Sequence, residues 1–364
     1  MKLRELCTKL EEWAPLAYQE SYDNSGLITG DPEQELKGVL VSLDCLENVV
    51  EEAIKRNCNV IVSHHPIVFK GLKSLTGKNY VERTVLKAIK NDIALYAIHT
   101  NLDNIHTGVS KMMAERIGLE NTKVLAPKNG LLKMLVTYVP ENSAEKVRSA
   151  LFAAGAGSLG AYSECNFSVE GLGTFKGSEL SNPTIGVRGV REQVSEERIE
   201  LVFPSYIESR VISTLKNTHP YEEVAYSVVS IDNANQFVGS GMVGELSEPL
   251  NEVEFLKNLK EKFKIDCIRH TSFLNNKIKK VALCGGAGSF LLNVAKQADA
   301  DVFITGDFKY HEFFDAENTI LIADIGHYES EQYTMDLIAD FLRKNFPKFA
   351  VHLSEVNTNP INYL

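Results

Sequence analysis

The chain has 364 residues, which is longer than a single compact core usually supports, so we expect two domains or one domain with an insertion. A hydrophobic fraction of 44% and a charged fraction of 24% are ordinary for a globular protein and exclude an intrinsically disordered one. The formal net charge of -10 makes broad binding to a nucleic-acid backbone unfavourable, so nucleic acid is not an expected partner.

The N-terminal segment is expected to form an amphipathic helix and not a signal peptide. Charged residues interrupt it every few positions, whereas a signal peptide needs an unbroken apolar stretch. The sequence contains no run of 18 apolar residues, so we expect no membrane span. The cysteines contain no CxxC pair and are predicted to be buried free thiols in a reducing compartment: Cys7, Cys45, Cys58, Cys165, Cys267 and Cys284. These features predict a cytoplasmic protein.

Two segments of the chain share one design. Residues 37–66 and the segment from residue 279 onward both follow the order strand, turn, helix and strand, at an offset of 242 that pairs Val39 with Val281 and Ser63 with Thr305. Each is followed by a second short apolar strand, at residues 93–103 and 320–331. Continuous β-branched runs of this kind are typical of buried parallel strands. The sequence therefore predicts an α/β protein with duplicated lobes, formed by residues 1–124 and 244–364, that enclose a cleft.

Residues 125–243 do not fit this repeat. They contain a glycine-rich piece, alternating strands and a helix expected over residues 205–217, a pattern typical of an α+β unit of ferredoxin-like type. Acidic residues outnumber basic ones in this segment, so it is not a basic nucleic-acid-binding arm. We expect an inserted domain whose function the sequence does not reveal.

Residues suited to metal binding follow three of the predicted strands. His64 and His65 come directly after a strand and before Pro66, and adjacent side chains of an extended chain point to opposite faces, so the two rings are expected to serve two different ions. A simple hydrogen-bonded or exposed histidine pair is the competing interpretation. Asp103 ends the next strand and could bridge both ions, although a lone aspartate there is often a helix N-cap.

His327 and Glu331 complete this set. Their spacing of four places them on one face of a helix, where they either bind a common ion or form a surface pair. Ligands at three positions related by the repeat favour the metal interpretation. Three histidines and two carboxylates without cysteine suit Zn²⁺, Mn²⁺, Fe²⁺ or Co²⁺. Because five side chains cannot saturate two ions, water should fill the remaining positions, as in catalytic sites.

Other polar segments are weaker candidates. Asp23 to Leu27 predicts a tight turn that could line the cleft entrance. Backbone N–H groups of the turn containing Gly286, Gly288 and Ser289 could seat a phosphate. Asp307 and His311 are candidates for proton transfer or for support of the ligands, or else belong to a capped helix start. The remaining histidine-containing segments are predicted to be structural: His99 in the core, His106 on the surface and residues 218–223 in a turn.

The motifs SHHP, HTNLD, TGDFKYH and GHYESE together resemble the NIF-three-like dinuclear-metal proteins, the GTP cyclohydrolase I type 2 homologues. The resemblance covers the whole chain outside the insert, which is similar to the PII- or CutA-like module of the longer bacterial members. It implies that His64, His65, Asp103, His327 and Glu331 are the metal ligands. It also implies a homohexamer whose sites open towards an inner cavity.

The function expected from these residues is a metal-dependent hydrolase of GTP cyclohydrolase type. A metal-bound hydroxide would attack a nucleotide-like substrate, and two divalent ions per chain would generate the nucleophile. The alternative is a non-enzymatic metal-binding regulatory or partner-binding protein in which the insert senses a ligand. No guanine-reading motif is present in the sequence to favour GTP itself.

Overall fold

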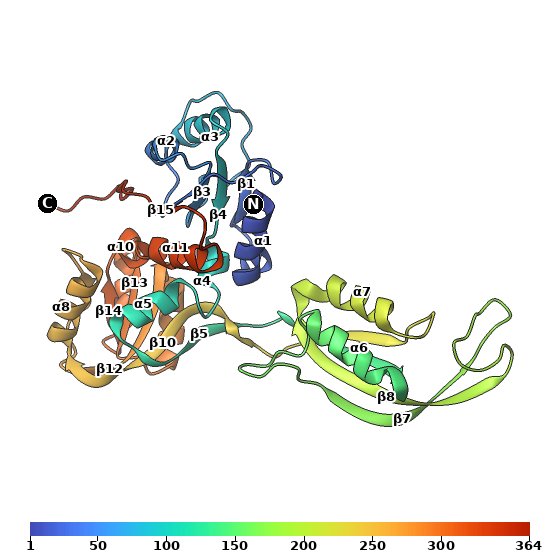
Figure 1. Ribbon diagram of the computed structural model, residues 1–364. Coiled ribbons are helices and arrows are strands. Elements are labelled where there is room, and N and C mark those ends of the chain that lie inside the picture. Colours follow the sequence, from blue (N-terminus) through green and yellow to red (C-terminus); the bar gives the residue numbers. More distant parts are fainter. The chain divides into compact units, whose positions relative to one another are not determined.

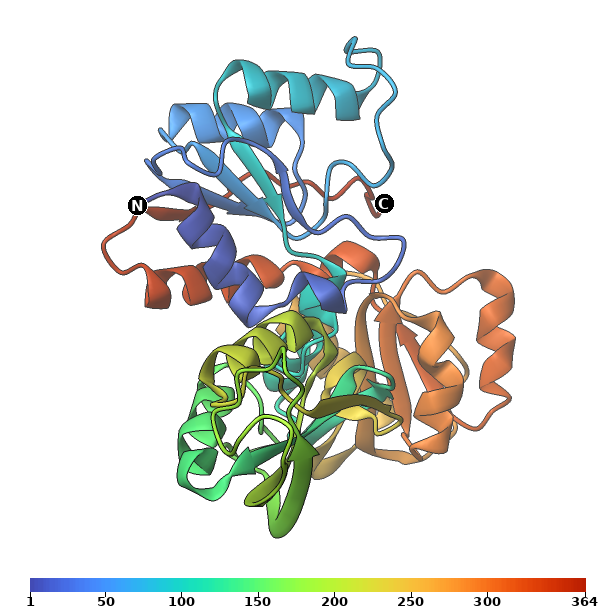
Figure 2. The ribbon, with the colours of Figure 1, turned by 90° about the vertical axis from the view of Figure 1, so that its right-hand side faces the viewer.

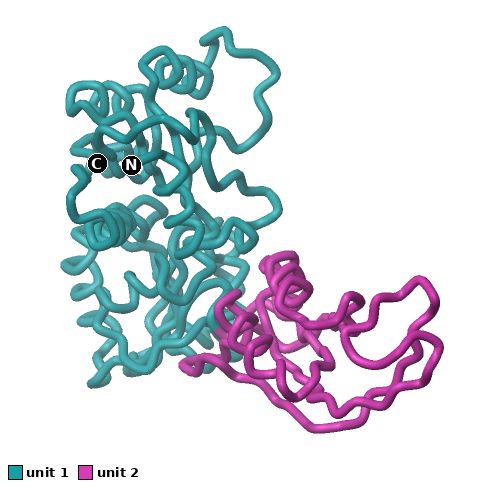
Figure 3. The backbone as a smooth tube through the Cα atoms, turned by 45° about the vertical axis from the view of Figure 1, so that its right-hand side comes forward, with its two compact units in different colours: residues 1–126, 237–364 teal, residues 127–236 magenta.

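The computed structural model describes all residues from 1 to 364. The chain forms two compact units, one made of residues 1–126 and 237–364 and the other of residues 127–236 (Figure 3). The mixed α/β architecture with several sheets confirms the predicted class at this level. None of the helices combines the length and the apolarity needed to cross a membrane.

The first unit contains a five-stranded sheet with the order β1-β4-β3-β2-β15. Strands β2, β3 and β4 are parallel neighbours, β15 pairs parallel with β2, and β1 pairs antiparallel with β4. The strands span Gly26–Thr29 (β1), Val39–Ser42 (β2), Val60–Ser63 (β3), Ala94–Ala97 (β4) and Val351–Leu353 (β15). The carboxyl ends of β2, β3 and β4 therefore meet at one edge.

Helices cover both faces of this sheet. Alternate strand residues such as Leu40 and Ile61 pack against α2 (Glu47–Lys55) and α3 (Tyr80–Lys90), which lie side by side in Figure 1. Helix α1 (Leu3–Trp13) and helix α11 (Thr334–Asn345) contact each other through the stacked rings of Trp13 and Phe341, whose centroids are 4.2 Å apart. The three central strands, β2, β3 and β4, consist entirely of buried residues because neither of their faces meets water.

The second sheet of this unit has six strands in the order β11-β14-β13-β12-β10-β5. Here too three successive strands, β12, β13 and β14, are parallel neighbours. The strands span Glu120–Lys128 (β5), Asn235–Asn251 (β10), Arg269–His270 (β11), Lys277–Ala287 (β12), Val302–Gly306 (β13) and Leu321–Asp324 (β14). Helices α5 (Val109–Ile117) and α8 (Glu252–Phe263) cover one face, and α9 (Leu292–Gln297) packs on the other.

Short helical segments connect these elements. Two of them hold candidate ligands directly after a strand: α4 (Thr100–Asp103) follows β4, and α10 (His327–Glu331) follows β14. Figure 2 shows the first unit from a second side, with α10 and α11 in red between its two sheets. The remaining segments are 3₁₀ turns, namely η1 (Leu16–Tyr18), η3 (Ser289–Leu291) and η4 (Tyr310–Ala316).

The second unit has one antiparallel sheet with the order β7-β8-β6-β9 and two helices. Leu201 and Phe203 of β8 are buried against α6 and α7, whereas the long hairpin of β7 and β8 carries many exposed residues. The elements span Leu132–Pro140 (β6), Glu141–Ala153 (α6), Phe167–Lys176 (β7), Arg191–Pro204 (β8), Ser205–Ile207 (η2), Glu208–Thr218 (α7) and Tyr226–Ile231 (β9).

Two details differ from the sequence prediction. The insert was expected to end at residue 243, but residues 237–243 belong to the first unit because β10 runs without interruption and pairs with β12 from Met242 onward. All six cysteines are free thiols, as expected, but Cys165 is half-buried and Cys267 is exposed. Both positions have a charged neighbour, Glu164 or Asp266, and do not lie in apolar runs.

Candidate metal centre

His64 and His65 lie at the carboxyl end of β3. Their backbone N–H groups donate to the carbonyls of Ser42 and Leu43 at 3.1 and 2.9 Å, so the chain stays extended beside β2 for two residues beyond the strand. His64 is fully buried, and the side chain of His65 is 16% exposed. The backbone pairing with β2 fixes the position from which each imidazole projects.

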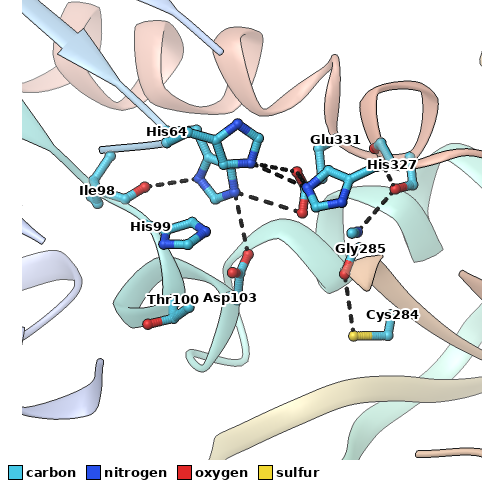
Figure 4. A network of polar contacts seen from close by, with 12 residues as sticks. His64, Ile98, His99, Thr100, Asp103, Cys284, Gly285, His327 and Glu331 are labelled. Atoms are coloured by element: carbon cyan, nitrogen blue, oxygen red, sulfur yellow. Dashed lines mark hydrogen bonds and ion pairs between the residues drawn. The ribbon is translucent and has the colours of Figure 1, made fainter. Parts of the chain in front are cut away.

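One ring nitrogen of His64 has a partner and the other has none. Nδ1 lies 2.8 Å from the carbonyl oxygen of Ile98, which can only accept, so Nδ1 carries a proton and Nε2 is the nitrogen left to bind an ion. Nε2 faces Asp103 Oδ1 at 3.6 Å and Glu331 Oε1 at 3.8 Å, as Figure 4 shows. These separations are too long for hydrogen bonds, and both Nε2 and Asp103 Oδ1 are buried without a partner. Three electron-rich atoms that converge in this way match the ligand set of a cation.

A second group of converging atoms lies beside the first. His65 donates through Nδ1 to Asp44 Oδ1 at 2.8 Å, and His327 donates through Nδ1 to Asp307 Oδ2 at 2.7 Å. The Nε2 atoms of both rings then point at Glu331 Oε2, from which they lie 3.0 and 3.1 Å away. A carboxylate behind each imidazole fixes its orientation and raises its basicity, which is the usual arrangement around histidine metal ligands.

Glu331 is the carboxylate that belongs to both groups. The ligand atoms of His64, Asp103 and Glu331 lie within 4.8 Å of one another, and so do those of His65, His327 and Glu331. Asp103 belongs only to the first group, so Glu331, and not Asp103 as the sequence analysis considered, is the carboxylate common to both groups. His64 and His65 each join one of these groups, and together with His99 they form a third group of ligand atoms within 4.8 Å of one another.

A glycine makes room for Glu331. Gly286 has φ +60, and a Cβ at this position would lie 2.4 Å from Glu331 Oε1. Its N–H donates to Ser330 Oγ at 3.0 Å, and the N–H of Gly288 donates to Thr305 Oγ1 at 2.9 Å. The two N–H groups are therefore already occupied, so the geometry does not support the phosphate seat predicted at Gly286, Gly288 and Ser289. The turn instead lets the backbone approach Glu331 closely.

The electrostatics of the metal-free protein follow from this crowding. Burial disfavours the charged form of His65, but Asp44 and Glu331 outweigh it and raise its pKa to about 9. Burial likewise opposes the charge of His327, while Glu331 and Asp307 raise its pKa to about 11. Burial would raise the pKa of Glu331, yet the adjacent imidazoles hold it well below its usual range. Without an ion, protons occupy the positions that metal would take.

The structure adds residues that the sequence analysis treated as structural. His99 donates through Nδ1 to Asp23 Oδ1 at 2.8 Å, and its ring lies 5.3 Å from those of both His64 and His65. Asp23 also accepts hydrogen bonds from Ser25 and from Thr100. The signal was present in the sequence, because His99 follows β4 at the same sheet edge as the histidine pair. Asp44, two residues after β2, gave the same signal and was also missed.

The remaining candidates lie in different places. Asp307 contacts the cluster through His327, whereas His311 lies in η4, where its ring contacts Tyr310 and Phe314. His106 is exposed, as predicted. In the second unit, His219 bonds the carbonyl of Tyr138 and the N–H of Tyr221 within a turn, also as predicted.

The ligand cluster lies in a cavity of about 850 Å³ in the first unit. His65, Asp103, Asp307, His327 and Glu331 line it, while His311 does not. The cavity is large enough for a small organic molecule beside the cluster. This combination of converging ligand atoms and open volume suits a site that binds ions and a reactant together.

Comparison with known proteins places this geometry in a wider context. The family model described as Duf34/NIF3 (NGG1p interacting factor 3) matches residues 1–360. A Bacillus subtilis protein named GTP cyclohydrolase 1 type 2 homolog is 40% identical over 360 residues, which cover 97% of this chain and 96% of that protein. A Bacillus cereus protein related to NIF3 has a solved structure that is 36% identical and superposes with a TM-score of 0.87, covering 100% of this chain and 99% of that one. The Staphylococcus aureus protein SA1388 superposes with a TM-score of 0.79 at 33% identity over the same shares of the two chains.

Proposed function

The chain belongs to the Duf34/NIF3 family, and from that premise we propose that its first unit binds two divalent metal ions and catalyses metal-dependent hydrolysis of a nucleotide-like substrate. The reaction class is that named in its curated relatives, GTP cyclohydrolase 1 type 2 homologs. Paired divalent ions lower the pKa of bound water and stabilise developing negative charge. The protein's own residues supply the ligands, their orientation and the cavity.

The observation that carries this proposal is the position of His64 Nε2. The Ile98 carbonyl holds Nδ1, and Nε2 then faces two carboxylate oxygens at 3.6 and 3.8 Å, too far for a hydrogen bond. Leaving such groups buried and unpaired costs about 1–3 kcal/mol each, and a bound cation removes that cost. A merely structural histidine would be expected to satisfy both nitrogens.

Each ion is assigned three protein ligands. His64, Asp103 and Glu331 would hold one, and His65, His327 and Glu331 the other. Imidazole and carboxylate donors without thiolate suit Zn²⁺, Mn²⁺, Fe²⁺ or Co²⁺. Three ligands per ion leave coordination positions open to water and substrate, which distinguishes catalytic from purely structural sites.

Supporting residues hold the ligands in place. Asp44 and Asp307 fix the rings of His65 and His327, and Thr358 in turn donates to Asp44 at 2.5 Å. Asp307, which lines the cavity, accepts the Nδ1 hydrogen bond of His327. We assign Asp307 a positioning role and leave His311 outside the site.

The same premise extends to the architecture. The equivalent parallel triplets β2-β3-β4 and β12-β13-β14 support our interpretation of the first unit as duplicated α/β lobes. The sheet of the second unit, with two helices on one face, supports a ferredoxin-like inserted domain. The homohexameric assembly and the cytoplasmic location stay predictions.

The proposal is tested by turnover. Protein loaded separately with Zn²⁺, Mn²⁺, Fe²⁺ and Co²⁺ should hydrolyse at least one member of a panel of nucleosides, nucleotides and phosphoesters, and Glu331→Gln should abolish that activity while the fold persists. Glu317→Gln is the matched control, because Glu317 is an exposed glutamate in the same unit that only pairs with Lys296. Metal-loaded protein without any turnover would favour the non-enzymatic alternative, a regulatory metal-binding protein.

A further inference from the structure

The cavity around the candidate metal centre carries neither lysine nor arginine, and its only basic side chains are the histidines of the cluster. Five carboxylates line it: Glu20, Asp44, Asp103, Asp307 and Glu331. Two divalent ions would contribute four positive charges, so even the loaded cavity has a formal charge of about -1. Proteins that bind polyphosphates usually surround them with arginine, lysine or free N–H groups. This cavity lacks the cationic side chains.

Two backbone donors of the cavity wall are already occupied. The glycine turn at the cavity wall is the natural place for phosphate binding. Its Gly286 and Gly288 N–H groups donate to Ser330 and Thr305 instead. A triphosphate chain would therefore meet a negatively charged cavity whose glycine turn offers neither of these two donors.

Aromatic side chains, in contrast, are abundant and exposed on the cavity walls. Tyr22, Phe69, Tyr80 and Phe290 line the cavity and are 67%, 49%, 56% and 67% exposed. The ring of Phe69 meets that of His99 edge to face, with centroids 5.7 Å apart, so one aromatic wall lies directly beside the ligand cluster. Exposed aromatic rings of this kind stack on the faces of planar heterocycles.

We propose that this cavity binds a planar, uncharged ring compound, a nucleobase or nucleoside, and that it discriminates against nucleoside triphosphates. The inference rests on the proposed function and narrows its substrate class. Stacking on Phe69 and Phe290 supplies the binding energy. The acidic lining opposes any substrate that brings three or more negative charges.

Calorimetric titration of the full-length, Zn²⁺-loaded protein tests this inference. The probes are adenosine, guanosine, cytidine, uridine, GTP and inorganic tripolyphosphate. At least one nucleoside should bind at least tenfold more tightly than GTP, and tripolyphosphate should not compete with it. Binding of none of the four nucleosides, or tighter binding of GTP than of guanosine, would overturn the proposal.

Variants separate the contributions of stacking and charge. Phe69→Ala and Phe290→Ala should each weaken nucleoside binding about tenfold, the usual effect of removing one stacking ring. Phe314→Ala is the matched control, because Phe314 is 64% exposed but does not line the cavity, and it should change nothing. Ala287→Lys adds a cation to the lining at an exposed position and should strengthen GTP binding. An effect of Phe314→Ala as large as that of Phe290→Ala would contradict the stacking model.

Metal analysis of the same samples distinguishes failure of the proposed metal site from failure of the proposed substrate class. Loss of metal in every sample would refute the dinuclear site itself. Retained metal combined with a preference for GTP would refute only the substrate class proposed here. Retained metal is expected in all the aromatic variants, because none of these rings supplies a ligand atom.

Discussion

The replacement Gly286→Ala tests how tightly the backbone is fitted to Glu331. Alanine at φ +60 carries a backbone cost of about 1–2 kcal/mol. Its Cβ would also lie 2.4 Å from Glu331 Oε1, so the carboxylate must move, at a typical overpacking cost of about 1–3 kcal/mol. Together these effects predict a loss of about 2–5 kcal/mol in the free energy of unfolding. Because the displaced oxygen belongs to the shared ligand, metal affinity should fall at least 10–100-fold.

Gly77→Ala is the matched control for this experiment. Gly77 lies in the same unit with φ +79, and a Cβ there would make only ordinary contacts at 3.7 Å or more. This variant should show the backbone cost alone and retain full metal content. Urea titration and chelator competition measure the two quantities. If Gly286→Ala matched Gly77→Ala in both, the reasoning about the close approach to Glu331 would be refuted.

Four further predictions follow from the geometry. Asp103→Asn should reduce the metal content from two ions to one, because Asp103 belongs to one ligand group only, and elemental analysis that still finds two would contradict the assignment. Asp44→Asn should weaken metal binding about 10–100-fold by freeing the His65 ring, as chelator competition would show. In metal-free protein, the free energy of unfolding should fall as the pH rises from 6.5 towards 9. The pKa values of His65 and His327 are raised from 6.5 to about 9 and about 11, so the folded state keeps protons that the unfolded chain releases in this range. Urea titrations that show a rise in the free energy of unfolding would contradict this prediction. Leu201→Ala should destabilise the second unit by about 2–5 kcal/mol without changing the metal content, which thermal unfolding and metal analysis check together.

The sequence predicted the parts of the fold that depend on local pattern. Apolar β-branched runs located β2, β3, β12 and β13, and the parallel pairs β2–β3 and β12–β13 were expected from the strand-helix-strand order. The long antiparallel strand β10 was not predicted in full, because its register with β12 is fixed by pairing between distant segments. Its continuity shifted the insert boundary from residue 243 to residue 236.

The same distinction holds at the site. Spacing and strand ends were sufficient to nominate the five candidate ligands. The partner of each ring nitrogen could not be predicted, because it depends on rotamers and on contacts such as that between His65 and Asp44. For the same reason His99 was assigned to the core, although its ring faces the cluster through its contact with Asp23. The phosphate seat is not supported at Gly286 and Gly288, because their N–H groups donate to side chains, and a sequence motif does not show such hydrogen bonds.

The central claim is that the first unit holds two divalent ions. Its most direct test is elemental analysis of protein purified without chelator or affinity metal, beside a variant that combines His64→Ala with Glu331→Ala. The account predicts close to two transition-metal ions per chain in the native protein and none retained in the variant. Native protein that binds no metal, even after reloading with Zn²⁺, Mn²⁺, Fe²⁺ or Co²⁺, would contradict the claim.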